Sequence, residues 1–140
     1  MGDDLFNNPR ETAARLACCL AKLNRRTNLD EVTVIDLIAT YMKHFHLGDK
    51  NLHGDSPYID QEYEARRERV KKGLALLVRA GYVDSDFTAS WYQPKDECTT
   101  YSQSFHGSYI RDYRESVDAV LSNDLHHIAF AVARMEPRYE

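Results

Sequence analysis

The residues best suited to bind another molecule are the cations between positions 61 and 72. The segment QEYEARRERVKK carries Arg66, Arg67, Arg69, Lys71 and Lys72. It also carries Glu62, Glu64 and Glu68, at spacings of three or four residues from several of these cations, where side chains of one helix pair. The segment is therefore either a helix that reads DNA, a surface for an acidic protein partner, or a solvated helix with internal ion pairs.

Charge favours the protein partner over autonomous DNA binding. The chain of 140 residues has a formal net charge of −4, whereas domains that bind nucleic acid alone usually carry a basic excess. Arginine pairs with carboxylates through two parallel hydrogen bonds, which suits it to protein interfaces. A second basic cluster, which includes Arg10 and Arg15, falls in the first predicted helix. The predicted partner- or DNA-binding residues are Arg66, Arg67, Arg69, Lys72, Arg10 and Arg15.

No pattern in the chain is typical of catalysis or of a resident metal or cofactor. The six histidines lack the spacings of zinc sites. Cys18 and Cys19 fall in an apolar helical pattern, where burial raises a thiol pKa, and no base is implied for Cys98. We therefore expect no enzyme, no catalytic or metal-binding residue, no cofactor and no small-molecule substrate.

Hydropathy and cysteine content predict a soluble cytoplasmic protein with no membrane partner. No stretch approaches the roughly 20 apolar residues that span a bilayer. Three cysteines, two of them adjacent, form no disulfide framework and indicate reduced thiols.

The elements that position these residues follow from apolar spacing and stop signals. Asn8 and Pro9 predict a helix start, and the apolar spacing continues to about residue 23. Asp30 is the predicted cap of a second, centrally buried helix to about residue 45. A third helix is predicted from Asp60 to about Ala80, with Gly81 as its stop. Two short strands follow within 82–93, then a short helix over 97–105 and a helix that is capped by Ser108 and runs to about residue 121.

Three helices followed by a hairpin is the order of a winged helix-turn-helix. We expect a mainly α fold with a small β-hairpin in a single domain, residues 1–140. Within it, residues 6–93 form a winged-helix-like core and residues 94–140 a C-terminal helical extension; for the tail beyond 123, helix is favoured over strand. A small, dimeric transcription regulator that binds DNA is one function open to this order of elements.

A set of short motifs along the chain resembles a known family. The stretches are FNNPRETAARL at 6–16, NLHGDSPY at 51–58 and EYEARRERVKKGLALLVRAGYV at 62–83. In this order and spacing they are similar to the middle component of ABC-three-component systems, the Lamassu type among them. The matching positions are Phe6, Asn7, Pro9, Glu11, Leu52, His53, Pro57, Glu62, Arg66, Arg67, Gly73, Leu74, Gly81, Val83, Tyr92 and Tyr109.

Two positions depart from the family pattern, and the tail has no counterpart in it. Gly54 stands where a proline is usual, and Ile59 or its neighbour lacks the arginine that often follows the loop proline.

The resemblance implies a non-catalytic accessory subunit of a bacterial defence complex against phage or plasmids. Such a subunit docks on an SMC- or Rad50-like ATPase and helps to hold or release an effector nuclease, with contact to duplex DNA within the complex as an open alternative. On this view His53 and Pro57 shape the loop that enters the third helix, and the arginines of that helix meet the partner.

Overall fold

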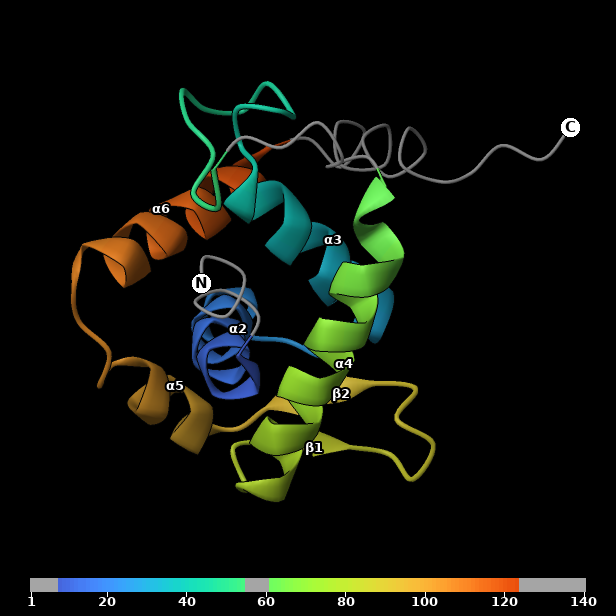
Figure 1. Ribbon diagram of the computed structural model, residues 1–140. Helices are drawn as coiled ribbons and strands as arrows, with labels where there is room; N and C mark the ends of the chain where they lie inside the picture. The colour runs from blue at the N-terminus through green and yellow to red at the C-terminus, as the bar shows by residue number, and fades with distance from the viewer. Residues whose placement is uncertain (1–7, 55–60, 124–140) are drawn as a thin grey trace, which may run out of the picture.

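The computed structural model describes residues 8–54 and 61–123, which form a helical fold with one two-stranded hairpin (Figure 1). The helices are α2 (Pro9–Leu23), α3 (Leu29–Thr40), α4 (Tyr63–Arg79), α5 (Asp96–Ser102) and α6 (Ser108–Ser122). The strands are β1 (Val83–Ser85) and β2 (Tyr92–Pro94), which pair antiparallel with Ser85 opposite Tyr92. The predicted mainly α class with a small hairpin is confirmed. The predictions for Phe6, Asn7, Pro57 and the tail beyond residue 123 lie outside the described residues.

Helix α2 is the central element of the fold. In Figure 1 it is seen nearly end-on, with the other four helices around it. It packs against α3, α4, α5 and α6. Its start is the predicted one: Pro9 is the first helical residue, and the Asn8 side chain accepts a hydrogen bond from the backbone N–H of Arg10. Asn24, in the left-handed conformation, ends it.

Helix α3 is buried on all sides from Val32 to Thr40, as its broad apolar pattern predicts. Both of its predicted ends are wrong, however. Asn28 is the cap, accepting a hydrogen bond from the backbone N–H of Glu31, because a cap must precede the first helical residue and Asp30 already lies inside the helix. The helix ends at Thr40, whose carbonyl accepts a hydrogen bond from the backbone N–H of His53.

Two hydrophobic clusters lie on opposite sides of α2. One is formed with α4, the hairpin and Cys98, and the other with α3 and α6, where Ile35, Ile38 and Val117 are buried. The packing of α2 on α4 is close, because Gly73 offers no side chain: a Cβ there would lie 2.9 Å from Leu16 Cδ1. The predicted helical stop after α4 is also present, since Gly81 has φ +85°.

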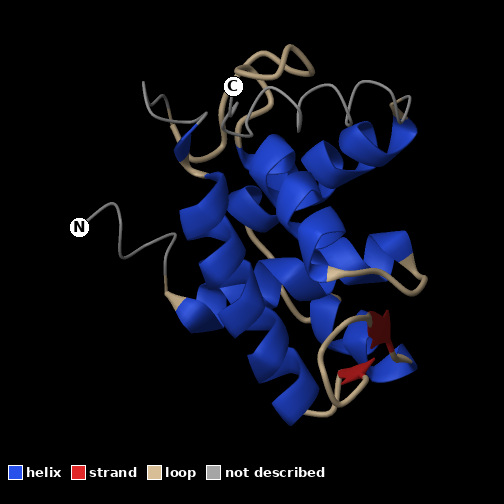
Figure 2. Cartoon of the chain, turned by 90° about the vertical axis from the view of Figure 1, so that its right-hand side faces the viewer, coloured by secondary structure: helices blue, strands red, loops and turns tan. Residues whose placement is uncertain are grey.

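The hairpin follows α4 and lies at one end of the helical body (Figure 2). A third segment extends it: Thr27, between α2 and α3, exchanges two backbone hydrogen bonds of 2.8 Å with Tyr92 of β2. Residues 9–94 thus contain three helices followed by a hairpin, the order of elements that is compatible with a winged helix-turn-helix. The start of α6 is corrected by one residue, with Gly107 in the cap position and Ser108 as the first helical residue.

Candidate functional site

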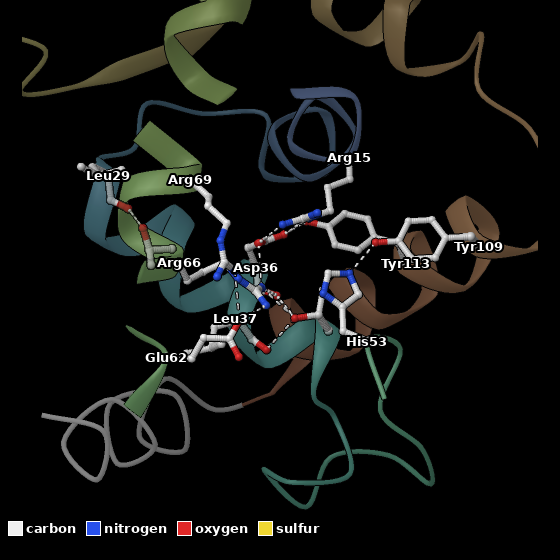
Figure 3. A network of polar contacts seen from close by, with 12 residues as sticks. Arg15, Leu29, Asp36, Leu37, His53, Glu62, Arg66, Arg69, Tyr109 and Tyr113 are labelled. Atoms are coloured by element: carbon white, nitrogen blue, oxygen red, sulfur yellow. Dashed lines mark hydrogen bonds and ion pairs between the residues drawn. The ribbon is translucent and has the colours of Figure 1, made fainter. Parts of the chain in front are cut away.

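A buried aspartate at the centre of the fold gathers side chains from four helices (Figure 3). Asp36 of α3 is fully buried. Its Oδ1 accepts hydrogen bonds from Arg15 Nε at 2.8 Å and from the Tyr113 hydroxyl at 2.7 Å. Its Oδ2 accepts from Arg15 Nη2 at 2.9 Å and from Arg66 Nη1 at 3.0 Å. The bidentate geometry with Arg15 is the strongest form of an arginine–carboxylate pair.

The helices supply these residues from otherwise apolar surroundings. Arg15 lies on the inner face of α2 before the buried Leu16, and Asp36 interrupts the apolar run VTVIDLIA of α3. Arg66 comes from the first turns of α4 and Tyr113 from the buried side of α6. We call Asp36, Arg15, Arg66 and Tyr113 the aspartate network.

A second carboxylate balances the charge of the aspartate network. Arg66 Nη2 donates to Glu62 Oε1 at 2.9 Å, the i,i+4 pair that the sequence predicts, and Arg66 Nη1 donates to Thr40 Oγ1 at 2.8 Å. The two buried guanidinium groups are thus compensated by Asp36 and by the partly buried Glu62. Buried charges persist only when they are paired and hydrogen-bonded in this way.

The protonation states in the aspartate network follow from this pairing. Burial by itself raises the pKa of Asp36, but the guanidinium groups of Arg15 and Arg66 outweigh it and hold the pKa well below the usual value. Burial and the charge of Asp36 raise the pKa of Tyr113 well above its usual value. At neutral pH the carboxylate is therefore charged and the phenol neutral, an arrangement that stabilises a fold and leaves no base free for proton transfer.

His53 and Tyr109 lie beside the aspartate network and connect the central loop to α6. His53 Nε2 and the Tyr109 hydroxyl are 2.6 Å apart, and the two rings are stacked. Burial, followed by the nearby charges of Arg15 and Arg66, lowers the pKa of His53 to about 3. His53 is therefore neutral at physiological pH, and its contacts join the loop to α3 and α6.

The structure divides the predicted binding residues into a buried pair and a surface group. Arg15 and Arg66 are 2% and 1% exposed, so the structure places them in the core and not on a surface patch. The sequence misses this because adjacent arginines on one helix point about 100° apart, and spacing does not say which of them faces inward.

The other predicted cations reach the surface to different extents. Arg67 Nε donates to Asp30 Oδ1 at 2.8 Å, and Arg69 Nη1 donates to Glu62 Oε1 at 3.2 Å. Arg10 and Lys72 are exposed, and neither has an ion-pair partner among residues 8–54 and 61–123.

Two members of the aspartate network were not singled out from the sequence. Asp36 carried a signal, because a lone carboxylate inside a fully apolar helix requires a buried cation. Tyr113 carried none, since a tyrosine at helical spacing is equally typical of an apolar face.

Other kinds of site find little support in the described part of the chain. All three cysteines are buried, and burial raises the pKa of Cys98 to about 11. Within residues 8–54 and 61–123 there is no group of three or more His, Cys, Asp or Glu side chains placed to hold a metal ion. No helix in the same residues combines the length and apolar character needed to cross a bilayer.

A surface cavity of about 680 Å³ lies next to the aspartate network, between the start of α2, the end of α5 and the start of α6. Its lining is mainly apolar and aromatic, with Ala14, Tyr101, Phe105 and Ile110 inside and Arg10 among the polar residues.

Comparison with known proteins identifies the family. A family model described as ABC-three component (ABC-3C) system Middle Component 2 matches residues 5–128, which include every described helix and both strands. No curated protein and no solved structure matches the chain. The resemblance seen in the motifs thus extends over most of the sequence, and the chain belongs to the middle-component family of ABC-three-component systems.

Proposed function

We propose that this protein is a non-catalytic accessory subunit of a Lamassu-type bacterial defence complex. In this proposal it docks on an SMC- or Rad50-like ATPase and bridges that ATPase to an effector nuclease, so that ATP hydrolysis and DNA cleavage are carried out by the partners. The observation that carries the proposal is the match of residues 5–128 to the middle-component family.

The geometry supports a rigid binding module. The aspartate network commits Arg15 and Arg66 to the interior, where each cation has a carboxylate partner. A core fixed by such pairs holds the surrounding helices in one arrangement, and a pre-ordered surface loses less entropy when it binds.

The surface group of cations is the part of the predicted site that would meet the partner. Arg10 and Lys72 are exposed, whereas Arg67 and Arg69 are half-buried and already paired with Asp30 and Glu62. In the proposal, acidic residues of the ATPase pair with Arg10 and Lys72. Contact with duplex DNA within the complex would use the same cations.

Co-purification from the native operon tests this proposal. A tagged copy of the chain is expected to elute with the ATPase and the effector in fixed stoichiometry. The variants Arg10→Glu and Lys72→Glu are expected to weaken that association, with Glu115→Ala, an exposed residue of α6, as the matched control.

The winged-helix-like arrangement favours a second candidate, a transcription regulator that binds duplex DNA. The two functions predict opposite results for the isolated protein. A salt-dependent affinity for duplex DNA, together with no co-purification of an ATPase, would establish the regulator and refute the accessory subunit.

A further inference from the structure

The loop that joins the two strands is held in one shape by its own first residue. We call residues 86–91 the wing loop. The Asp86 carboxylate accepts hydrogen bonds from the Thr88 hydroxyl at 2.9 Å and from the backbone N–H groups of Ser90 and Trp91 at 2.6 and 3.3 Å. It also accepts one from the Ser90 hydroxyl. A single side chain thus closes the whole loop on itself.

The base of the wing loop is fixed to the helical body. The guanidinium carbon of Arg26 lies 3.8 Å from the centroid of the Trp91 ring, a cation–π contact, and Tyr92 bonds to Thr27 through the backbone. Ala89 is held at φ +57°, a left-handed conformation that is unfavourable for a non-glycine residue. The loop keeps this unfavourable conformation because the surrounding hydrogen bonds determine it.

At the tip of this ordered loop stands a fully exposed phenylalanine. Phe87 is the one large apolar side chain that is exposed in the described part of the chain. Aromatic side chains presented on rigid backbones are typical anchors of protein interfaces, because they bury a large area and lose little freedom on binding.

The charge around Phe87 determines which class of macromolecule the wing loop suits. Asp84 and Asp86 precede it by three residues and by one, and residues 83–90 contain no lysine or arginine. Hydrogen bonds from Ser90 and Thr88 lower the pKa of Asp86 to about 2, so its carboxylate is charged at neutral pH; Asp84 adds a second formal negative charge. Although Arg26 lies at the base of the loop, the charged residues of the segment that carries Phe87 are all anions, which repel a phosphate backbone and make insertion into DNA the less favoured mode. They attract a basic protein surface.

We infer that the wing loop docks Phe87 into an apolar pocket of another protein component of the system, a pocket whose rim carries lysine or arginine. The inference rests on the proposed function, since it names one surface by which the accessory subunit holds its partner. The wing loop would form an acidic interface, in addition to the basic interface proposed for Arg10 and Lys72.

Binding of purified variants to the other co-expressed components of the system tests the inference. Phe87→Ala is expected to weaken the affinity at least 30-fold, the effect of losing an interface anchor. Phe87→Leu is expected to keep most of it, and Asp84→Lys to slow association through charge reversal at the rim. Glu115→Ala, at an exposed position of α6 and outside the wing loop, serves as the control. All variants are expected to keep the wild-type melting temperature, since Asp84, Phe87 and Glu115 are exposed.

A photo-crosslinking amino acid at position 87 identifies the occupant. A crosslink to a protein component of the system supports the inference, whereas a crosslink to DNA or to a second copy of this chain overturns it. If wild type and Phe87→Ala bind the components equally, the docking role is refuted and the accessory-subunit function stands. If wild type binds none of them, the proposed function itself fails, and the docking inference with it.

Discussion

The Tyr113 hydroxyl donates a hydrogen bond of 2.7 Å to Asp36 Oδ1, 77 residues earlier in the sequence, in a fully buried site. This contact joins α6, which follows the winged-helix-like arrangement, to the middle of its most buried helix. Helix α6 is therefore part of the core of the fold and not an appendage packed on its surface.

Removing the charge of Asp36 is expected to destabilise the protein strongly. Asp36→Asn leaves Arg15 and Arg66 buried without their common carboxylate, and breaking a buried ion pair in this way costs about 3–5 kcal/mol. Urea denaturation followed by circular dichroism measures the free energy of unfolding. Asp30→Asn, on the same helix but paired with Arg67 at the surface, is the control and should change it by less than about 1 kcal/mol. Equal effects of the two substitutions would contradict the structural role of the aspartate network.

The Tyr113 hydroxyl offers a second measurement of the same network. Tyr113→Phe removes one hydrogen bond to a charged acceptor and is expected to cost about 1.5–3 kcal/mol. The matched variant Tyr63→Phe removes a hydrogen bond of 3.0 Å to Asp30, also from a tyrosine to an aspartate, but at an exposed site. Tyr63→Phe should lower the free energy of unfolding clearly less than Tyr113→Phe does. Chemical denaturation of both variants measures the difference.

His53 should make stability depend on pH below neutrality. Its pKa is lowered to about 3 in the folded state, whereas an unfolded histidine titrates near 6.5. Between these values the unfolded chain binds the extra proton, so stability is fully present above about pH 6.5 and falls as the pH decreases toward 3. From pH 7 to pH 5 the loss is expected to be about 2 kcal/mol.

The variant His53→Gln isolates that contribution, because it keeps a polar side chain that does not titrate. Thermal denaturation at pH 7 and pH 5 should show a smaller loss for the variant than for wild type. The same loss in both proteins would mean that another group causes it. The lowered pKa values of Asp30 and Glu31 do not explain it, because their contribution to stability is lost only below about 4.5, the usual pKa of a glutamate.

Gly73 should not tolerate even a methyl group. A Cβ at this position lies 2.9 Å from Leu16 Cδ1, 3.0 Å from Thr12 Cγ2 and 3.3 Å from the backbone nitrogen of Ala13. Leu16 is fully buried and the Ala13 contact is to the backbone of α2, so overpacking of about 1–3 kcal/mol should exceed the gain of up to about 1 kcal/mol in helix propensity. Melting temperatures of Gly73→Ala and of the exposed neighbour Lys72→Ala provide the comparison; a stabilised Gly73→Ala variant would refute the close packing of α2 on α4.

The sequence predicts the elements of this fold well because their signals are local. Asn8 with Pro9 marks the start of α2, and Gly81 marks the stop after α4, each through backbone chemistry confined to a few residues. The end of α3 is not predictable in this way. Its last residue, Thr40, accepts a hydrogen bond from the backbone N–H of His53, which lies beyond a loop.

The orientation of the arginines of α4 cannot be predicted from the local sequence pattern either. Arg66 faces inward because Asp36, 30 residues earlier, lies opposite it, whereas the next residue, Arg67, pairs at the surface. Neighbouring residues of equal charge therefore differ in role for a reason that only the packing of α3 against α4 supplies. The family resemblance named both arginines and could not separate them.

The aspartate network also has a consequence for biosynthesis. Asp36 emerges from the ribosome early, but Tyr113, its last partner, is added 77 residues later. At about 5–20 residues per second, this interval lasts roughly 4–15 s. During that time α3 carries a charged group and a wide apolar surface without the helix that covers them. The nascent chain therefore completes its core only after α6 has been synthesised, and premature termination before α6 is expected to yield a fragment that aggregates or is degraded.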